Sequence, residues 1–576
     1  MEVEKKYDVV IIGGGLSGLT SGLYLQEAGL KVLLLERAPQ AGGLTSSWQV
    51  HEQEDTDGKN FVLQHLKEED IVLQHPMHMI FRDKYPNVID VYKHLGILDA
   101  NLTEPLKEFN IIDSRLVKHK FKMEDSILPP PFHAIKTVLR LKMGIVDKLS
   151  FLLSGLPILY LGNSLNREEP PDSFWDMVSM EALLKRFWMT ERARDFAASY
   201  VPSIYNLDSI EVNARRMAAI TFGTIFNSNR GLWYQLVNDN YITGTVEPHV
   251  KRFIEAGGTI KLNCEVRRII HNETKVQKIL YQDFNTGTWI TCPCCGCKQP
   301  VLDEGFCRQC GQRWTMREPA NLTQPQIEPP VGEHLQEVFA KYYVAAVRGH
   351  QLLPIMSLDS PLRAHPYFQR LGREKGACLS IARIFYDKKI TDEKFITGTS
   401  RRAFTFNGCQ DIGNIMPRYS KYPGSVVDVL ADRAESLQLL PVKEFLKCVV
   451  RDLARVWPQA KDAQVKLALG AHIHPAVLYH KEVPRLPGER NKFVDTPLRN
   501  LFACNCSLGL IGIGMESAYQ TGKMAANRIL EQEAKPLVHV YGFPEYEVSF
   551  LPRMAYKIIS ILVKVRNFLG KILTSI

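Results

Sequence analysis

Short apolar runs alternate with helical patterns along this chain, which predicts an α/β fold. Residues 9–12 and 32–35 are continuous apolar runs of the kind that form buried parallel strands. Between them, residues 19–28 have the apolar spacing of a helix, and Gly29 follows where helices commonly end. A strand, a helix and a second strand in this order are the unit of a doubly wound parallel sheet.

The turn between the first strand and the helix has the sequence G-x-G-x-x-G. In a dinucleotide site the first glycine makes the tight turn, the second lets the backbone approach the pyrophosphate, and the third lets helix and strand pack closely. An acid ends the second strand, where it can accept hydrogen bonds from an adenosine ribose. The pattern predicts a site for NAD or FAD. The predicted contacts are Gly13, Gly15, Leu16, Ser17, Gly18, Glu36 and Arg37.

A glycine pair that follows the acid favours FAD over NAD. It resembles the second phosphate-side loop of flavoproteins in the FAD-dependent amine oxidase and phytoene desaturase superfamily. Residues 71–97, 342–356 and 515–518 (Met-Glu-Ser-Ala) resemble motifs of the carotenoid desaturases that act on phytoene and zeta-carotene. The further FAD contacts that this resemblance implies are Gly42, Gly43, Leu44, Val266, Asn505, Met515 and Glu516. Asn505 stands where relatives often have an acid.

The resemblance implies a doubly wound, Rossmann-like FAD-binding domain interleaved with an α+β substrate domain that faces the membrane. The FAD-binding domain would comprise residues 1–80, 236–286, 333–357 and 490–535, and the substrate domain residues 81–235 and 358–489. The implied chemistry is desaturation of a long apolar isoprenoid: a hydride passes to the flavin, and the electrons continue to a quinone-type acceptor. No catalytic acid or base can be named. The polar segment 51–60 is expected to be a surface insertion.

Six of the twelve cysteines lie between residues 292 and 310, a clustering that argues for a metal site. Two C-x-x-C-G motifs predict a closed tetrahedral site in a small inserted zinc ribbon, residues 287–332. Zinc is expected in preference to a rubredoxin-like iron centre, and the ribbon could dock a protein partner. The predicted ligands are Cys292, Cys295, Cys307 and Cys310; Cys294 and Cys297 offer an alternative register.

Two segments combine apolar residues with lysine and arginine. Residues 132–162 are apolar with spaced basic residues, and residues 548–576 form a predicted basic amphipathic helix. Both patterns are typical of helices that lie in a membrane interface. No apolar run reaches 18 residues, and no signal peptide is recognised, so we expect a cytoplasmic protein bound peripherally to the membrane. The net charge of +9 is partly local to the last segment, and no nucleic-acid module is recognised.

Three other functions remain open at this point. The first is another flavoenzyme acting on isoprenoids, such as a carotene isomerase or a hydroxysqualene dehydroxylase. The second is an amine oxidase, although basic apolar segments argue against it. The third is a non-catalytic flavoprotein scaffold that recruits a partner through the metal ribbon.

Overall fold

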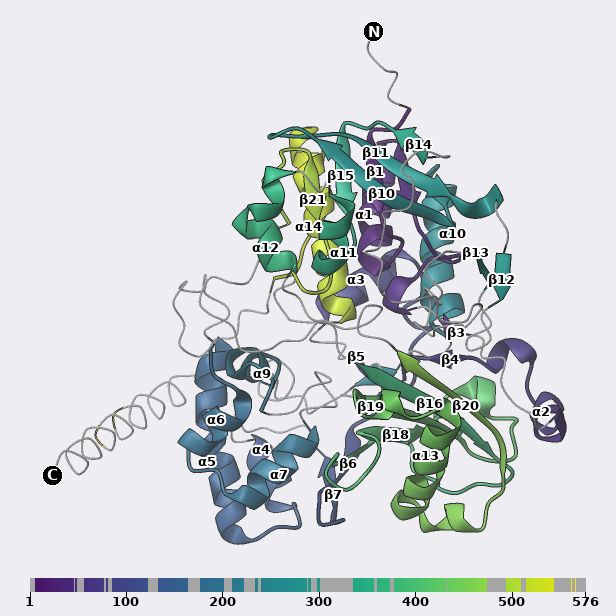
Figure 1. Ribbon diagram of the computed structural model, residues 1–576. Coiled ribbons are helices and arrows are strands. Elements are labelled where there is room, and N and C mark those ends of the chain that lie inside the picture. Colours follow the sequence, from purple (N-terminus) through teal and green to yellow (C-terminus); the bar gives the residue numbers. More distant parts are fainter. Residues whose placement is uncertain are drawn as a thin grey trace, which may run out of the picture.

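The computed structural model contains two α/β units, one above the other in Figure 1. It describes residues 6–45, 47–48, 56–76, 79–80, 85–122, 133–163, 177–200, 210–221, 234–236, 240–286, 289–291, 298–300, 335–356, 360–372, 378–432, 434–473, 494–508 and 514–542, together with residues 561 and 565.

A five-stranded parallel sheet forms the centre of the first unit, as the apolar runs predict. Its order is β21-β15-β1-β2-β9. The strands are β1 (Val9–Ile12), β2 (Val32–Leu35), β9 (Thr259–Lys261), β15 (Tyr342–Ala345) and β21 (Leu501–Ala503), and every neighbouring pair is parallel. All four residues of β1 and of β2 are buried, because both faces of the sheet are covered.

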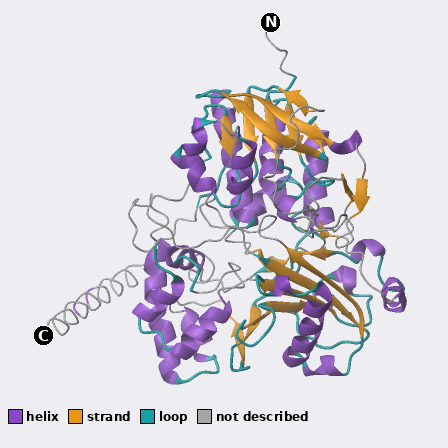
Figure 2. Ribbon diagram, viewed as in Figure 1, coloured by secondary structure: helices purple, strands orange, loops and turns teal. Residues whose placement is uncertain are grey.

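Helices cover one face of this sheet and a second sheet covers the other. Alternate residues of β1 and β2 pack against α1 (Leu16–Glu27), α10 (Glu247–Glu255) and α14 (Met515–Gln532). The other residues face an antiparallel sheet, with α11 (Gly349–Ile355) and α12 (Pro366–Gly372) beside it. The strands of that sheet are β10 (Cys264–His271), β11 (Val276–Asp283) and β14 (Leu335–Val338). Figure 2 shows these layers by secondary structure.

A seven-stranded sheet forms the centre of the second unit. Its order is β20-β16-β19-β18-β17-β6-β7, antiparallel except between β17 and β6. The strands are β6 (Glu108–Ile112), β7 (Lys118–Lys122), β16 (Leu379–Tyr386), β17 (Thr397–Thr399), β18 (Gly408–Asp411), β19 (Val426–Asp432) and β20 (Val465–Ile473). One face of the sheet packs on α13 (Val442–Val456). All seven strands lie within the ranges expected to form the substrate domain, residues 81–235 and 358–489.

The other face of the seven-stranded sheet carries two apolar clusters. At the β20 end, α2 (Thr56–Leu63) packs on the sheet through Val62, and Leu66 and Leu73 join the same cluster. The segment expected to be a surface insertion therefore leads into the core. At the β6–β7 end, the face meets α4 (His133–Leu139), α5 (Ile145–Asn163) and α7 (Glu191–Tyr200). Helices α6 (Met180–Arg186) and α9 (Ala214–Thr221) complete this helical group, at lower left in Figure 1.

The inserted segment begins with two short antiparallel strands, β12 (Trp289–Thr291) and β13 (Lys298–Pro300). Residues 292–297, with the first C-x-x-C-G motif, connect these strands, but all four predicted metal ligands lie outside the described residues. The C-terminal segment 548–576 also lies outside them except for Ile561 and Val565. Among the helices that the structure describes, none is both long and apolar enough to cross a membrane.

Candidate functional site

The glycine-rich turn lies at the carboxyl end of β1, between the strand and the first residue of α1. Gly13 has a φ of +102°, and a Cβ atom there would lie 2.8 Å from the Ala346 carbonyl oxygen, just beyond β15. A Cβ on Gly18 would overlap the Gly13 carbonyl oxygen. Both positions therefore exclude every side chain. Leu16 and Ser17 are buried in the first turn of α1, whose amide groups point toward this edge of the sheet.

The glycine pair closes directly onto this turn. The Gly42 N–H donates to the Gly14 carbonyl at 2.8 Å, and Gly15 and Gly42 pair as a parallel bridge. Two backbone loops free of side chains thus lie side by side at the start of α1. Leu44 and Arg37 flank this pair of loops and are half-buried. The arrangement suits the close approach of a pyrophosphate, because backbone N–H groups and a helix N-terminus favour negative charge.

Glu36 is buried at the end of β2 and is held by backbone amides. Its carboxylate accepts hydrogen bonds from the Gly14 N–H at 2.6 Å and from the Ala38 N–H at 2.8 Å. The Glu36 carbonyl also accepts from the Cys264 N–H, at the first residue of β10, two positions before Val266. The predicted ribose acceptor and the predicted adenine contact are therefore neighbours, although β10 follows Glu36 by more than 220 positions.

Asn505 lies just beyond β21, on the other side of the glycine-rich turn. Its side-chain N–H donates to the Val347 carbonyl at 3.1 Å, and its side-chain oxygen accepts from the Ser507 N–H at 2.9 Å. The hydroxyl of Ser17 donates to the Cys504 carbonyl at 3.3 Å. The carboxyl ends of β1, β15 and β21 are thus joined into one surface that extends from the glycine-rich turn to Asn505.

Met515 and Glu516 begin α14, but the Glu516 side chain has a structural role. Its carboxylate accepts hydrogen bonds from the Asn87 backbone N–H, the Asn87 side chain and the Val88 N–H, at 3.0, 2.7 and 2.9 Å. These amides belong to the first turn of α3 (Pro86–His94), so Glu516 caps α3. Burial raises the pKa of Glu516 to about 7, although the three hydrogen bonds favour the ionised form. The predicted FAD contacts of Met515 and Glu516 stay predictions.

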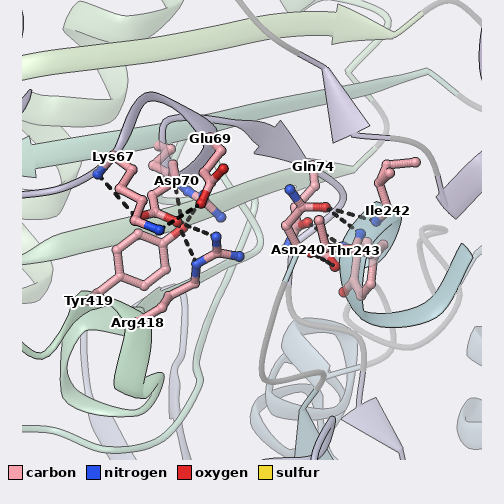
Figure 3. A network of polar contacts seen from close by, with 11 residues as sticks. Lys67, Glu69, Asp70, Gln74, Asn240, Ile242, Thr243, Arg418 and Tyr419 are labelled. Atoms are coloured by element: carbon pink, nitrogen blue, oxygen red, sulfur yellow. Dashed lines mark hydrogen bonds and ion pairs between the residues drawn. The ribbon is translucent and has the colours of Figure 1, made fainter. Parts of the chain in front are cut away.

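A polar network ties the seven-stranded sheet to the segment that precedes β4 (Leu73–Gln74). Arg418 forms an ion pair with Asp70, and the Tyr419 hydroxyl donates to the Asp70 carbonyl at 3.1 Å (Figure 3). Beyond β4, the Gln74 side chain accepts from the Tyr241 N–H at 3.0 Å, next to Asn240. Segment 70–74 therefore bridges the two units. No sequence pattern predicts this network, because its members are far apart along the chain.

The described residues fit a bound dinucleotide but no catalytic metal. Two loops that exclude side chains, the start of α1 and a buried acid lie along one edge of a parallel sheet, where such folds bind dinucleotides. Within the described ranges, no group of three or more His, Cys, Asp or Glu side chains could hold a metal ion. The predicted cysteine ligands are outside those ranges, so the metal site stays a prediction. His78, in the motif that resembles the desaturases, is also outside them.

Comparison with known proteins supports the dinucleotide site. Residues 11–95 match the NAD(P)-binding Rossmann-like domain. The chain is 25% identical to a chloroplastic 15-cis-phytoene desaturase from an Oncidium hybrid over 50% of this chain and 45% of that protein. It thus spans less than half of such plant relatives. It is 20% identical to the 15-cis-phytoene desaturase of Synechococcus elongatus over 91% of this chain and 96% of that protein.

Other proteins are similar to this chain over nearly its full length, in sequence or in fold. A carotenoid phi-ring synthase of Chlorobaculum tepidum is 22% identical over 92% of this chain and 90% of that protein. The cyclohexylamine oxidase of Brevibacterium oxydans has the same fold, with a TM-score of 0.60 at 14% identity over 92% of this chain and 100% of that one. A putrescine oxidase has a TM-score of 0.58 at 15% identity, covering 91% and 99%. The chain therefore has the fold of the FAD-dependent amine oxidase and phytoene desaturase superfamily, and phytoene desaturases are among its homologues.

Proposed function

We propose that this protein is an FAD-dependent oxidoreductase that desaturates a long, membrane-dissolved carotenoid. The observation that carries the proposal is the similarity to the Synechococcus phytoene desaturase over 91% of this chain. The geometry of the glycine-rich turn, which fits a dinucleotide, also supports the proposal. Amine oxidases share the fold at 14–15% identity, which supports the fold alone.

The residues that we assign contribute binding and orientation. Bound FAD would supply the redox chemistry: the flavin would take a hydride from the polyene, a base or the flavin itself would take the proton that leaves with it, and the electrons would pass to a quinone-type acceptor. Gly13, Gly15 and the Gly42–Gly43 pair would hold the pyrophosphate, and Glu36 the ribose. The sheet face with clusters at both ends would hold the apolar substrate and exclude water.

Peripheral binding to a membrane is part of the proposal. Five aliphatic side chains on α4 and α5 are between 50% and 67% exposed: Leu139, Ile145, Val146, Leu149 and Leu153. Exposed Lys136, Arg140 and Lys142 flank them. Aliphatic residues next to lysine and arginine suit an interface with anionic lipid. We call these eight residues the α4–α5 patch.

A second candidate function is chemistry on a carotenoid end ring. The similarity to a carotenoid phi-ring synthase over 92% of this chain favours it specifically. Anaerobic mixing of the FAD-loaded protein with polyenes in vesicles separates the two. Bleaching of the flavin by a linear carotene supports desaturation, whereas bleaching only by a ring-bearing carotenoid supports the second function. A flavin that no polyene bleaches would contradict both.

We also propose that the two cysteine pairs form a structural zinc site. Cys292, Cys295, Cys307 and Cys310 would supply four thiolates, and a closed site of this kind stabilises its segment without reacting. Metal analysis of the purified protein tests this directly. We expect about one zinc per chain, reduced to background in a Cys307→Ser, Cys310→Ser variant. Iron with a visible thiolate absorption would instead indicate an electron-transfer centre.

A further inference from the structure

Three polar side chains lie in one row across the seven-stranded sheet, on a face that is largely apolar. Arg383 on β16 lies opposite Asp428 on β19, and Asp428 lies opposite Gln410 on β18. Residues directly opposite each other in a sheet share a face. Two positions further along, the same face carries Ile381 and Leu430. Buried polar groups in an apolar face cost stability unless they are hydrogen-bonded.

Arg383 and Asp428 satisfy each other. The Arg383 Nε donates to Asp428 Oδ1 at 2.6 Å, and its Nη2 donates to Oδ2 at 2.9 Å. The remaining Arg383 nitrogen, Nη1, donates to the Tyr419 hydroxyl at 2.7 Å. All three side-chain nitrogens of Arg383 thus have acceptors, and Tyr419 links the ion pair to Asp70.

Gln410 differs from its two neighbours in the row. It is 0% exposed, and neither its amide oxygen nor its amide nitrogen has a hydrogen-bond partner among the described residues. Leaving a buried polar group unsatisfied costs about 1–3 kcal/mol. Native proteins keep few such groups, and those that persist call for an explanation such as a ligand or a bound water.

The row lies on the sheet face that looks toward the dinucleotide site. On one side, β3 (Ser47–Trp48) continues from the glycine pair and pairs with β4, which packs against β16. On the other side, Ile396 packs with the pair β5 (Met79–Ile80) and β8 (Gln235–Leu236). Figure 1 shows β3, β4 and β5 between the two units. Gln410 thus lies between two strand pairs at the junction where a substrate of the proposed reaction must meet the cofactor.

We propose that Gln410 hydrogen-bonds an oxygen atom of the substrate, so that the enzyme acts on an oxygenated isoprenoid rather than a pure hydrocarbon. This inference rests on the proposed function and narrows its substrate class. An amide can donate to a carbonyl or hydroxyl oxygen and accept from a hydroxyl, so a hydroxyl group satisfies both unused atoms. A hydrocarbon satisfies neither. A site built to bind a substrate oxygen rejects the analogue that lacks it, because its own buried polar groups stay unpaired.

The test compares Gln410→Met with the wild type on paired substrates. Each pair is a carotene and its hydroxylated or keto derivative of equal chain length, presented in neutral phosphatidylcholine vesicles. We expect the wild type to have a kcat/KM about 10- to 100-fold higher for the oxygenated partner. Gln410→Met should lose that preference, because its kcat/KM for the hydrocarbon rises while that for the oxygenated partner falls. Cys409→Ala, on the opposite face of β18, is the control and should keep the wild-type ratio.

Several outcomes would overturn the inference. Turnover with an equal ratio in the wild type and in Gln410→Met would reject the inference and leave the proposed function standing. A Gln410→Met variant with altered FAD affinity or a shifted flavin spectrum would assign the amide to the cofactor instead. A water on Gln410 in a substrate-bound crystal structure would assign it to solvent. No turnover of any polyene by the FAD-loaded protein would overturn the proposed function and the inference together.

Discussion

Glu516 at the start of α14 accepts three hydrogen bonds from the first turn of α3, two of them from Asn87. Asn87 in turn exchanges two hydrogen bonds with the backbone of Tyr541, at 2.9 and 3.1 Å. One buried carboxylate thus joins α14, α3 and the segment that follows α14. Because the start of α14 lies at the edge of the sheet that we assign to the cofactor, this junction supports the site indirectly.

The Glu516 junction predicts a dependence of stability on pH. The carboxyl pKa is raised in the folded protein from 4.5 to about 7, so folding favours the protonated form. Its contribution is present below pH 4.5 and is lost as the pH rises through 7. A shift of this size corresponds to about 3 kcal/mol at most. Glu516→Gln cannot ionise, so its melting temperature relative to the wild type should rise between pH 5 and pH 8.

Glu516→Ala is the companion variant for this junction. It removes the acceptor for three amides of α3 and should be destabilised at every pH, by about 1–3 kcal/mol. A parallel pH profile for the wild type and Glu516→Gln would contradict the assigned titration. Equal stability of Glu516→Ala and the wild type would contradict the capping role.

A matched pair of glycine substitutions tests the cofactor turn. Gly13 and Gly96 both have positive φ, +102° and +71°, but only at Gly13 would a new Cβ meet neighbouring atoms. Gly13→Ala should lose bound flavin, measured as the ratio of visible to protein absorbance. Gly96→Ala carries the backbone strain alone, about 1 kcal/mol, and should keep its flavin. Full flavin occupancy in Gly13→Ala would argue against this turn as the cofactor site.

The ion pair in the sheet face predicts a non-additive effect on stability. Asp428→Asn leaves the buried Arg383 guanidinium without its counter-charge and should cost about 3–5 kcal/mol in urea unfolding. The double variant Arg383→Met, Asp428→Leu removes both charges and should recover most of that loss. A double variant less stable than Asp428→Asn would contradict this prediction, because the ion pair would then contribute net stability to the fold.

The α4–α5 patch predicts how the protein binds vesicles. Val146→Asp, Leu149→Asp should reduce co-sedimentation with vesicles rich in phosphatidylglycerol at least tenfold, because acids on the apolar face repel anionic lipid. Leu439 is 85% exposed just before α13 in the same unit, outside the patch, and Leu439→Asp is the matched control with unchanged binding. Equal sedimentation of the patch variant and the control would mean that the protein contacts the vesicle through another surface.

The sequence was informative where chemistry is local. The turn with Gly13 and Gly18, the strands on either side and Glu36 lie within 28 residues, and the structure has them as the pattern predicts. The Glu516 side chain was assigned by a motif, which cannot reveal that α3 engages its carboxylate. Gln410 and Asp428 lie on strands whose register only the folded sheet defines. Arg383 alone could be noticed in the sequence, because it is a charged residue between Ile381 and Phe385 in a strand with an alternating pattern.

Pigment chromatography of carotenoid-producing bacteria tests whether the protein desaturates a carotenoid. The gene would be expressed in bacterial hosts that accumulate phytoene, zeta-carotene, lycopene or a hydroxylated carotenoid, with Gly13→Ala as the flavin-free control. We expect a product with more conjugated double bonds in at least one host, absent with Gly13→Ala, and in highest yield from the hydroxylated carotenoid. Unchanged pigments in every host, from a protein that carries FAD, would contradict the proposed action on carotenoids.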